Sequence, residues 1–217
     1  MGLNLEVARI RKSYNGQAVL RGCSFGFEAG RTYALLGQNG SGKSTFLRIA
    51  ALLEPPDAGE VRYGDNGVTL PHDLALRRRI TLLLPRIGVF NTSVFRNVAY
   101  GLKIRGRRGQ EVEDRVNEVL ERVGLLHKRA QQALDLSSGE TRRLGIARAL
   151  VIEPEVFCLD EPTANLDPNN AEIIEQIIFN MKTAGKSTII VVTHDSAQAR
   201  RLGDHPLVMD HGQIAPL

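Results

Sequence analysis

The chain has 217 residues, of which 42% are hydrophobic and 24% charged, and its formal net charge is +4. This length can bury a core without disulfides or metals, and we expect one domain built from subdomains. The mild basic excess is far below that of a nucleic-acid-binding surface, so we expect no nucleic-acid partner. No apolar run approaches a membrane span, and residues 1–6 lack the features of a secretory signal, which predicts cytosolic residence.

The first part of the chain has the pattern of β-structure. Residues 3–11 alternate loosely between apolar and polar, and residues 18–28 are predicted to form a further strand pair. Residues 59–63 have the composition of a short strand. They follow a break at Pro55, Pro56 and Asp57. Together these segments predict an antiparallel β portion in the N-terminal region.

A phosphate-binding loop follows an apolar strand at residues 33–36 and precedes a helix at residues 45–50. It fits the pattern G-x-x-x-x-G-K-[ST] and consists of Gly37, Gln38, Asn39, Gly40, Ser41, Gly42, Lys43 and Ser44. The glycines let backbone N–H groups point at phosphates, while Lys43 reaches the β- and γ-phosphates. Ser44 is placed to hold Mg²⁺. The loop therefore predicts binding of a nucleoside triphosphate.

Helical spacing dominates residues 93–150, which predicts a helical subdomain. The basic run of Lys103, Arg105, Arg107 and Arg108 is interpreted as a solvated loop. Within the block, residues 137–140 form an S-x-x-E capping box that opens an amphipathic helix. The box can be simply a helix start, or its N-terminus can bind a phosphate delivered by another molecule. The residues alone do not separate these two interpretations.

From residue 156 the pattern alternates between strands at 156–159 and 189–192 and helices at 173–181 and 195–202, which indicates a mainly parallel sheet. Asp160 and Glu161 stand at the carboxyl end of the first strand, where such sheets keep their ligand sites. We assign Asp160 to Mg²⁺, opposite Ser44, and Glu161 to the attacking water. The competing interpretation is an acidic turn that caps a helix. Cys23 and Cys158 are interpreted as structural.

These motifs together resemble an ATP-binding cassette (ABC) nucleotide-binding domain over nearly the whole chain. Residues 37–45, ending at Thr45, resemble the Walker A loop, residues 136–140 the signature, residues 156–161 Walker B, and residues 164–167 the D-loop. Residues 193–195 resemble the switch region with its histidine, His194. Tyr14 stands where the family places an aromatic side chain that stacks on adenine.

The resemblance implies an α/β P-loop NTPase with a RecA-like parallel-sheet core, an antiparallel β subdomain and a helical subdomain. The whole chain, 1–217, would be one ABC ATPase domain, with the core and β subdomain at about 1–85 and 151–217 and the helical subdomain at about 86–150. It also implies a head-to-tail dimer that sandwiches two ATP molecules, each between one subunit's Walker A and the other's signature helix.

The resemblance implies a role for each motif residue. Glu161, His194 and Lys43 would be the catalytic residues, with His194 contacting the γ-phosphate. Ser44 and Asp160 would hold Mg²⁺. The residues that would contact ATP are Tyr14, the Walker A residues through Thr45, the signature residues Ser137, Ser138, Gly139 and Glu140, and Asp167 of the D-loop.

Simpler interpretations remain for three of these residues. Tyr14 can be a strand-edge aromatic, and His194 can cap a helix. Asp167 precedes Pro168 and is also suited to be a helix N-cap, a role compatible with the D-loop.

Two positions depart from the family pattern. Pro85 stands where the Q-loop glutamine is expected, and proline offers neither the side-chain carbonyl nor its own N–H. We expect Ser44 and Asp160 to suffice for Mg-ATP binding while turnover is slow. Ser138 replaces the first signature glycine, for which we expect a milder effect.

The resemblance implies the energy-coupling subunit of an importer, located peripherally at the cytoplasmic face of the membrane. Its partners would be membrane permease subunits, a second ATPase subunit and, indirectly, an extracytoplasmic solute-binding protein. Residues 90–103 lie where the family docks a permease helix and resemble tungstate- and molybdate-type importers. We expect no C-terminal regulatory barrel after residues 209–212, as in a short anion or metal importer subunit.

Two other functions fit parts of the sequence. One is a soluble ABC ATPase acting on ribosomes or DNA, although the chain shows neither two cassettes nor a long coiled coil. The other is a regulatory ATP-binding module with little turnover, which Pro85 supports and Glu161 and His194 oppose.

Overall fold

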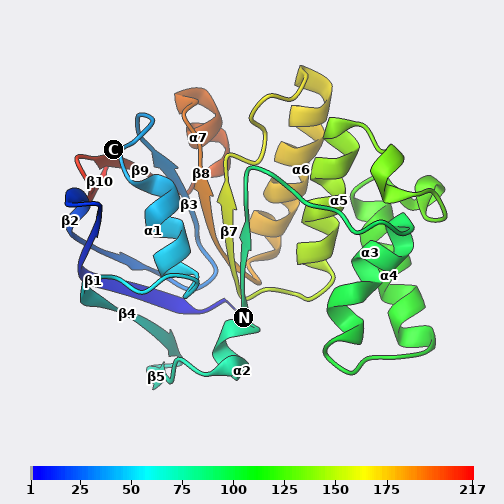
Figure 1. Cartoon of the computed structure of the whole chain (residues 1–217), viewed down its shortest axis with the longest axis horizontal. Coiled ribbons are helices and arrows are strands. Elements are labelled where there is room, and N and C mark those ends of the chain that lie inside the picture. The colour runs from blue at the N-terminus through cyan, green and yellow to red at the C-terminus, as the bar shows by residue number, and fades with distance from the viewer. Residues whose placement is uncertain (1) are drawn as a thin grey trace. The chain divides into compact units, whose positions relative to one another are not determined.

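A computed structural model describes residues 2–217, which form two compact units (Figure 1). The first contains residues 2–82, 155–161 and 179–217, and the second contains residues 83–154 and 162–178. Residues 162–178, which the sequence analysis assigns to the core, therefore cluster with the helical unit. In the described residues no helix is both long and apolar enough to cross a membrane.

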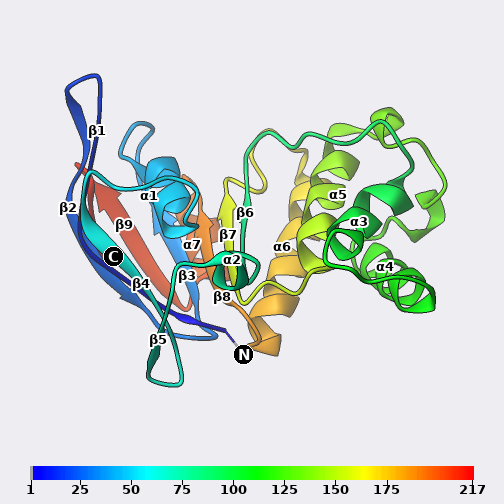
Figure 2. The ribbon, with the colours of Figure 1, turned by 60° about the horizontal axis from the view of Figure 1, so that its bottom comes forward.

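The first unit contains an antiparallel sheet with the strand order β2-β1-β4-β5 (Figure 2). Its strands are β1 (Asn4–Tyr14), β2 (Gln17–Phe27), β4 (Ala58–Asp65) and β5 (Val68–Leu70). The strand pair predicted for residues 18–28 is wrong, because β2 is one continuous strand that pairs with β1 along its length. The register shifts between β1 and β2 explain the loose alternation of residues 3–11.

A second sheet has the order β10-β9-β3-β8-β7-β6. Its strands are β3 (Thr32–Leu36), β6 (Ile80–Leu83), β7 (Val156–Asp160), β8 (Thr188–Val192), β9 (His205–Asp210) and β10 (Gln213–Pro216). Strands β9, β3, β8 and β7 run parallel, and β10 returns antiparallel to β9. The short apolar runs of β3, β7 and β8 are buried at every position, as strands covered on both faces require. The predicted parallel sheet is confirmed.

The helices of the first unit cover this sheet. They are α1 (Lys43–Ala50), α2 (Leu74–Arg77) and α7 (Ser196–Leu202), with the end of α6 (Pro168–Ala184). Phe46 and Leu47 of α1 belong to the main core, together with Tyr63 of the antiparallel sheet and Ile190 of the parallel one. Ala199 of α7 packs against Ala34 and Leu36 in a separate small cluster. Helix α1 is thereby buried by both sheets, which fixes the position of the loop before it.

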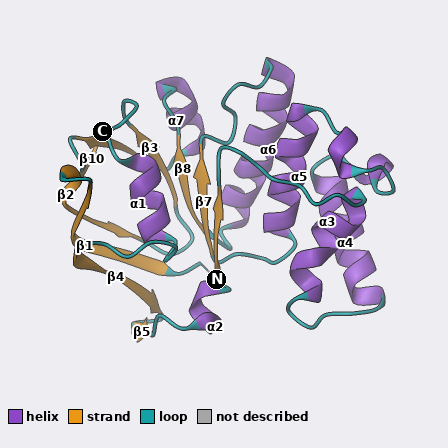
Figure 3. Ribbon diagram, in the orientation of Figure 1, coloured by secondary structure: helices purple, strands orange, loops and turns teal. Residues whose placement is uncertain are grey.

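The second unit is helical (Figure 3). It contains α3 (Val94–Lys103), α4 (Gln110–Arg122), the short 3-10 turns Leu126–Lys128 and Ala133–Asp135, α5 (Ser138–Leu150) and the first part of α6. Buried aliphatic side chains on α3, α4 and α5, such as Val98, Val116 and Ile146, form its interior. The helical spacing predicted within residues 93–150 is confirmed in α4, whose buried residues are Val112, Val116, Val119 and Leu120.

Candidate nucleotide-binding site

The phosphate-binding loop joins β3 to α1. Gly42 is the N-cap of α1 with φ of 105°, and a Cβ there would lie 2.9 Å from Cδ2 of Leu20. Only glycine adopts this conformation at this approach without strain. The loop then continues directly into the helix, since the N–H of Phe46 donates to the carbonyl of Gly42. The helix N-terminus therefore begins at the loop, as an anion site requires.

Lys43 is buried at the start of α1, with 5% of its surface exposed. Its Nζ donates to the carbonyl oxygens of Gly37 and Gln38 at 2.7 and 2.8 Å. Burial lowers the pKa of Lys43, and the nearby carboxylates of Glu161 and Asp160 oppose this effect. The ammonium group is thus held inside the loop by carbonyl groups, ready to exchange them for phosphate oxygens.

One hydroxyl group of the loop is left without a partner. The Oγ atom of Ser41 is buried, and within residues 2–217 it has no hydrogen-bond partner. A buried polar group of this kind is costly unless a ligand satisfies it. The loop therefore has an unused hydrogen-bonding group as well as the expected lysine, which fits a bound phosphate.

Three adjacent parallel strands bring the acidic and histidine residues to this loop. β3, β8 and β7 are neighbours in the sheet and end at Leu36, Val192 and Asp160. The N–H of Thr193 donates to the carbonyl of Leu35, and that of Glu161 to the carbonyl of Val192. The carboxyl ends of the strands that precede residues 37, 161 and 193 thus meet at one edge of the sheet, as expected for a ligand site in an α/β fold.

Asp160 is 3% exposed, and its side chain is hydrogen-bonded to Ser44. Burial raises the pKa of this carboxyl group, the adjacent Glu161 raises it further, and the bond to Ser44 and the charge of Lys43 lower it. The two residues assigned to Mg²⁺ from the sequence therefore lie next to each other. A buried carboxylate beside a hydroxyl is a hard-oxygen donor set of the kind that Mg²⁺ uses together with nucleotide phosphates.

Glu161 lies in a conformation that is uncommon for a side chain of its size, with φ of 47°. The side chain of His194 is 66% exposed, and its Nδ1 lies 3.7 Å from Oε1 of Glu161. The interpretation of His194 as a helix cap is wrong, because the carboxylate of Asp195 accepts the N–H groups of Ala197 and Gln198 at the start of α7. The histidine is therefore available to contact a ligand beside Glu161.

Tyr14 lies at the end of β1, and 39% of its surface is exposed. Its hydroxyl group donates to Glu54, which follows α1. Sequence reasoning missed Glu54 and its partners Lys12 and Arg48, because Glu54 lies 40 positions from Tyr14 and the pair shows no local pattern. Tyr14 is thus a strand-end aromatic whose hydroxyl group is anchored, and its contact with adenine remains a prediction.

The signature residues lie in the second unit, where the predicted capping box is present. Ser137 accepts the N–H of Glu140, and Glu140 accepts the N–H of Ser137, while Ser138 begins α5. Lys128 Nζ lies 2.5 Å from Glu140, which with the cap lowers the pKa of Glu140 to about 2. The helix N-terminus is therefore rigidly organised.

Gly139 and Asp167 are connected through one asparagine. A Cβ on Gly139 would lie 2.3 to 2.6 Å from side-chain atoms of Asn170, so a larger residue here would displace the Asn170 side chain. The side-chain amide and backbone N–H of Asn170 donate to Asp167 at 2.7 and 3.0 Å. Asp167 therefore caps α6 as predicted, and the cap lies against the signature glycine.

Comparison with known proteins places these features in a family. Residues 20–164 match the family model described as ABC transporter. The chain is 36% identical over 98% of its length, and 97% of the relative, to the tungstate uptake system ATP-binding protein TupC of Peptoclostridium acidaminophilum. It is 38% identical over 97% of its length to the phosphate import ATP-binding protein PstB 2 of Natronomonas pharaonis, covering 78% of that protein.

Solved structures agree. The dimeric bacterial ABC transporter cassette MJ0796 is 26% identical with a TM-score of 0.85, over 97% of this chain and 96% of that one. CbiO1 of Clostridium perfringens, described as part of the transporter complex cbiONQ, is 29% identical with a TM-score of 0.84. The match covers 97% of this chain and 86% of that one. This chain belongs to the ABC transporter family and has the fold of its ATP-hydrolysing cassettes.

Proposed function

We propose that this chain is the ATP-binding and ATP-hydrolysing subunit of an ABC importer for an inorganic oxyanion. The observation that carries the ATPase part is the convergence of the Lys43 loop, Asp160, and the Glu161–His194 pair at one edge of the parallel sheet. The importer part is supported by relatives whose names describe import systems.

ATP binding begins at the phosphate-binding loop. Backbone N–H groups at the start of α1 and the hydroxyl of Ser41 donate to the phosphate oxygens, and Lys43 releases the carbonyls of Gly37 and Gln38 to do the same. These donors oppose the charge that develops on the transferring phosphoryl group. Tyr14 stacks on the adenine ring.

The donor set at Ser44 and Asp160 fits Mg²⁺. Asp160 is buried with an oxygen partner but no cationic hydrogen-bond partner in the residues described, so a cation stabilises its charged form. Mg²⁺, when bound, neutralises phosphate charge. Glu161 orients the attacking water and accepts its proton, and His194 contacts the γ-phosphate from the neighbouring loop.

The chain functions as a head-to-tail dimer. The capped N-terminus of α5, with Ser137, Ser138 and Gly139, is an anion site that serves ATP held by the second subunit. A related cassette has been solved as a dimer, which supports this arrangement. ATP binding closes the dimer and hydrolysis reopens it, so a permease with different affinities for the two states is driven between its own conformations.

Membrane permease subunits contact the start of the second unit. Phe90 and Tyr100 are 41% and 48% exposed, their ring centroids are 4.8 Å apart, and the guanidinium of Arg148 lies over Phe90 at 4.6 Å. Asn97 is buried and bonds the backbone of Phe90, Thr92 and Ser93, which holds this segment in place. An exposed aromatic pair on a rigid segment suits a protein partner.

The solute is an oxyanion such as tungstate or molybdate, by analogy with the tungstate uptake relative, which matches nearly the full length of both chains. Other relatives are named for phosphate and methionine import, so the permease and a solute-binding protein select the substrate. The chain acts peripherally at the cytoplasmic face of the membrane.

The test is a mild-detergent pull-down of the tagged chain from its native membranes. We expect permease subunits to copurify with the wild type, less with Tyr100→Asp, and normally with Leu53→Asp, an exposed control position in the first unit. The recovered complex, placed in vesicles with its solute-binding protein, should accumulate labelled tungstate or molybdate in preference to phosphate. Recovery of ribosomes or nucleic acid without a permease supports the soluble-ATPase alternative instead.

A further inference from the structure

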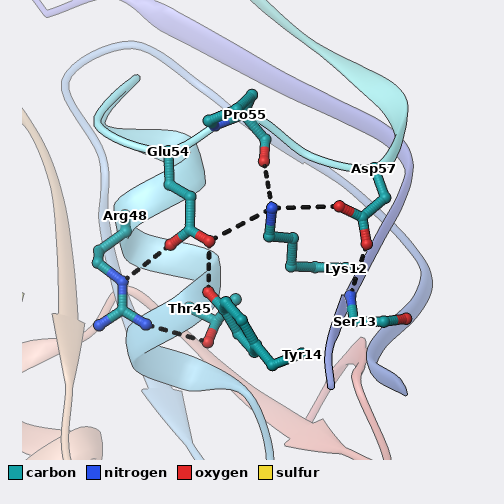
Figure 4. A network of polar contacts seen from close by, with 8 residues as sticks. All are labelled: Lys12, Ser13, Tyr14, Thr45, Arg48, Glu54, Pro55 and Asp57. Atoms are coloured by element: carbon teal, nitrogen blue, oxygen red, sulfur yellow. Dashed lines mark hydrogen bonds and ion pairs between the residues drawn. The ribbon is translucent and has the colours of Figure 1, made fainter. Parts of the chain in front are cut away.

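Tyr14 is joined to helix α1 by a continuous set of polar contacts (Figure 4). Oε1 of Glu54 accepts a hydrogen bond from the hydroxyl group of Tyr14, and Oε2 accepts one from Nε of Arg48 at 3.2 Å. Arg48 also donates to the hydroxyl of Thr45 at 3.3 Å. Thr45 is the second residue after Lys43, so these contacts connect the aromatic ring to the helix turn that begins the phosphate site.

Lys12 closes the network from the strand side. Its Nζ lies 3.4 Å from Glu54 and donates to the carbonyl of Pro55 at 2.9 Å and to Asp57 at 3.1 Å. The same ammonium lies over the Tyr14 ring, 5.7 Å from its centroid. Asp57 also accepts the N–H of Ser13, which fixes the strand just before the tyrosine. One face of the ring is thus covered by a cation.

Contacts to both the hydroxyl group and one face of Tyr14 restrict its ring. The side chains of Lys12 and Glu54 are 12% and 21% exposed. The bonds from Tyr14, Arg48 and Lys12 lower the pKa of Glu54, so its carboxylate stays charged at neutral pH. Tyr14 itself remains 39% exposed, which leaves surface for a ligand.

We propose that Glu54 is a positioning residue for base recognition, which holds the ring of Tyr14 through its hydroxyl and ties it to the helix that carries Lys43 and Ser44. This inference rests on the proposed contact between Tyr14 and adenine. A fixed ring loses less conformational entropy when a base stacks on it. The hydroxyl of Tyr14 therefore matters as well as its ring.

The experiment compares two ligands of the full chain. ATP engages both the phosphate loop and the ring, whereas inorganic tripolyphosphate engages only the loop. Dissociation constants of both, with Mg²⁺, are measured for the wild type, Tyr14→Ala, Tyr14→Phe, Glu54→Ala and the control Glu60→Gln. Glu60 is a carboxylate of β4 that pairs with Arg62, away from this network.

We expect Tyr14→Phe and Glu54→Ala each to weaken ATP binding by about two- to tenfold, the range that one net hydrogen bond supplies. Tripolyphosphate binding should change by less than about twofold, since the loop itself is intact. A double variant that combines Tyr14→Phe with Glu54→Ala should bind ATP no more weakly than Glu54→Ala alone, because both changes remove the same interaction. Glu60→Gln should bind both ligands normally.

The outcomes separate the two proposals. If Glu54→Ala weakens both ligands equally, Glu54 supports the phosphate loop and the inference is wrong. If Tyr14→Ala loses ATP selectively while Tyr14→Phe and Glu54→Ala do not, the ring contacts the base but the network does not position it. If Tyr14→Ala leaves the ratio of the two dissociation constants unchanged, the proposed contact between Tyr14 and adenine is wrong, and with it the inference that rests on it.

Discussion

The imidazole Nδ1 of His194 lies 3.7 Å from the carboxylate Oε1 of Glu161, although 33 positions separate them in the sequence. They meet because β7 and β8 are parallel neighbours, with Asp160 paired to Val192 in register. At this separation the carboxylate and the imidazole can together position one water molecule and one phosphate group.

Glu161→Gln is expected to lower the ATPase rate by about 10²- to 10⁴-fold, the range for loss of a general base. ATP binding should remain, because Lys43 and Ser41 are unchanged. Steady-state turnover and equilibrium binding test this, with Glu172→Gln on α6 as the control carboxylate. An ATPase rate within threefold of the wild type would remove Glu161 from the mechanism.

The same variant tests the dimer. With hydrolysis blocked, ATP should hold the closed dimer, which light scattering detects as a doubled mass that reverts on ATP removal. Absence of a dimer in Glu161→Gln with saturating ATP would contradict the role proposed for Ser137, Ser138 and Gly139.

Asp160→Asn is expected to raise the Mg²⁺ concentration for half-maximal ATPase activity at least about tenfold, the lower end of losses seen when a metal site loses a supporting group. The change also removes the desolvation cost of a buried charge, so thermal stability without nucleotide should not fall. A Mg²⁺ titration and a melting curve together separate lost metal binding from lost folding. Unchanged metal dependence would refute the assignment.

Lys128→Met should make the fold less sensitive to acid. The pKa of Glu140 is lowered from 4.5 to about 2, first by Lys128 and then by the cap at Ser137. A depressed folded-state pKa contributes stability that is complete above about 4.5 and is lost as pH falls toward 2. Denaturant unfolding between pH 2 and 6 should therefore show a shallower slope in the variant. Glu118→Gln on α4, which pairs with Arg122, is the control.

Pro85→Gln should raise turnover by roughly three- to tenfold, because the amide restores a carbonyl for Mg²⁺ and an N–H for water. Arg86→Gln introduces the same side chain one residue later and should have no effect. If Pro85→Gln leaves both the ATPase rate and its metal dependence unchanged, the hypothesis of slow turnover is wrong.

Cys23 and Cys158 should resist alkylation in the native protein. Both are fully buried, and burial raises their pKa values to about 11 and 12. Because the thiolate is the reactive form, iodoacetamide at pH 8 should label neither residue until denaturant is added. Rapid native labelling of either residue, read by mass spectrometry, would show that its strand opens.

The sequence alone determined the motifs that need only a few consecutive residues. The phosphate-binding loop, the capping box of Ser137 and Glu140, and the strand ending at Asp160 depend on local backbone preferences, and all three are present as predicted. The parallel sheet followed from alternating strands and helices for the same reason.

Only the tertiary structure decided which distant side chains meet. The bond of Tyr14 to Glu54 and the approach of Asn170 to Gly139 depend on how separate elements pack, and packing leaves no periodic trace in the sequence. The continuous strand β2 was missed because its pairing with β1, not its own pattern, defines it. Local chemistry therefore predicted the phosphate-binding loop, whereas the contacts around Tyr14 required the fold.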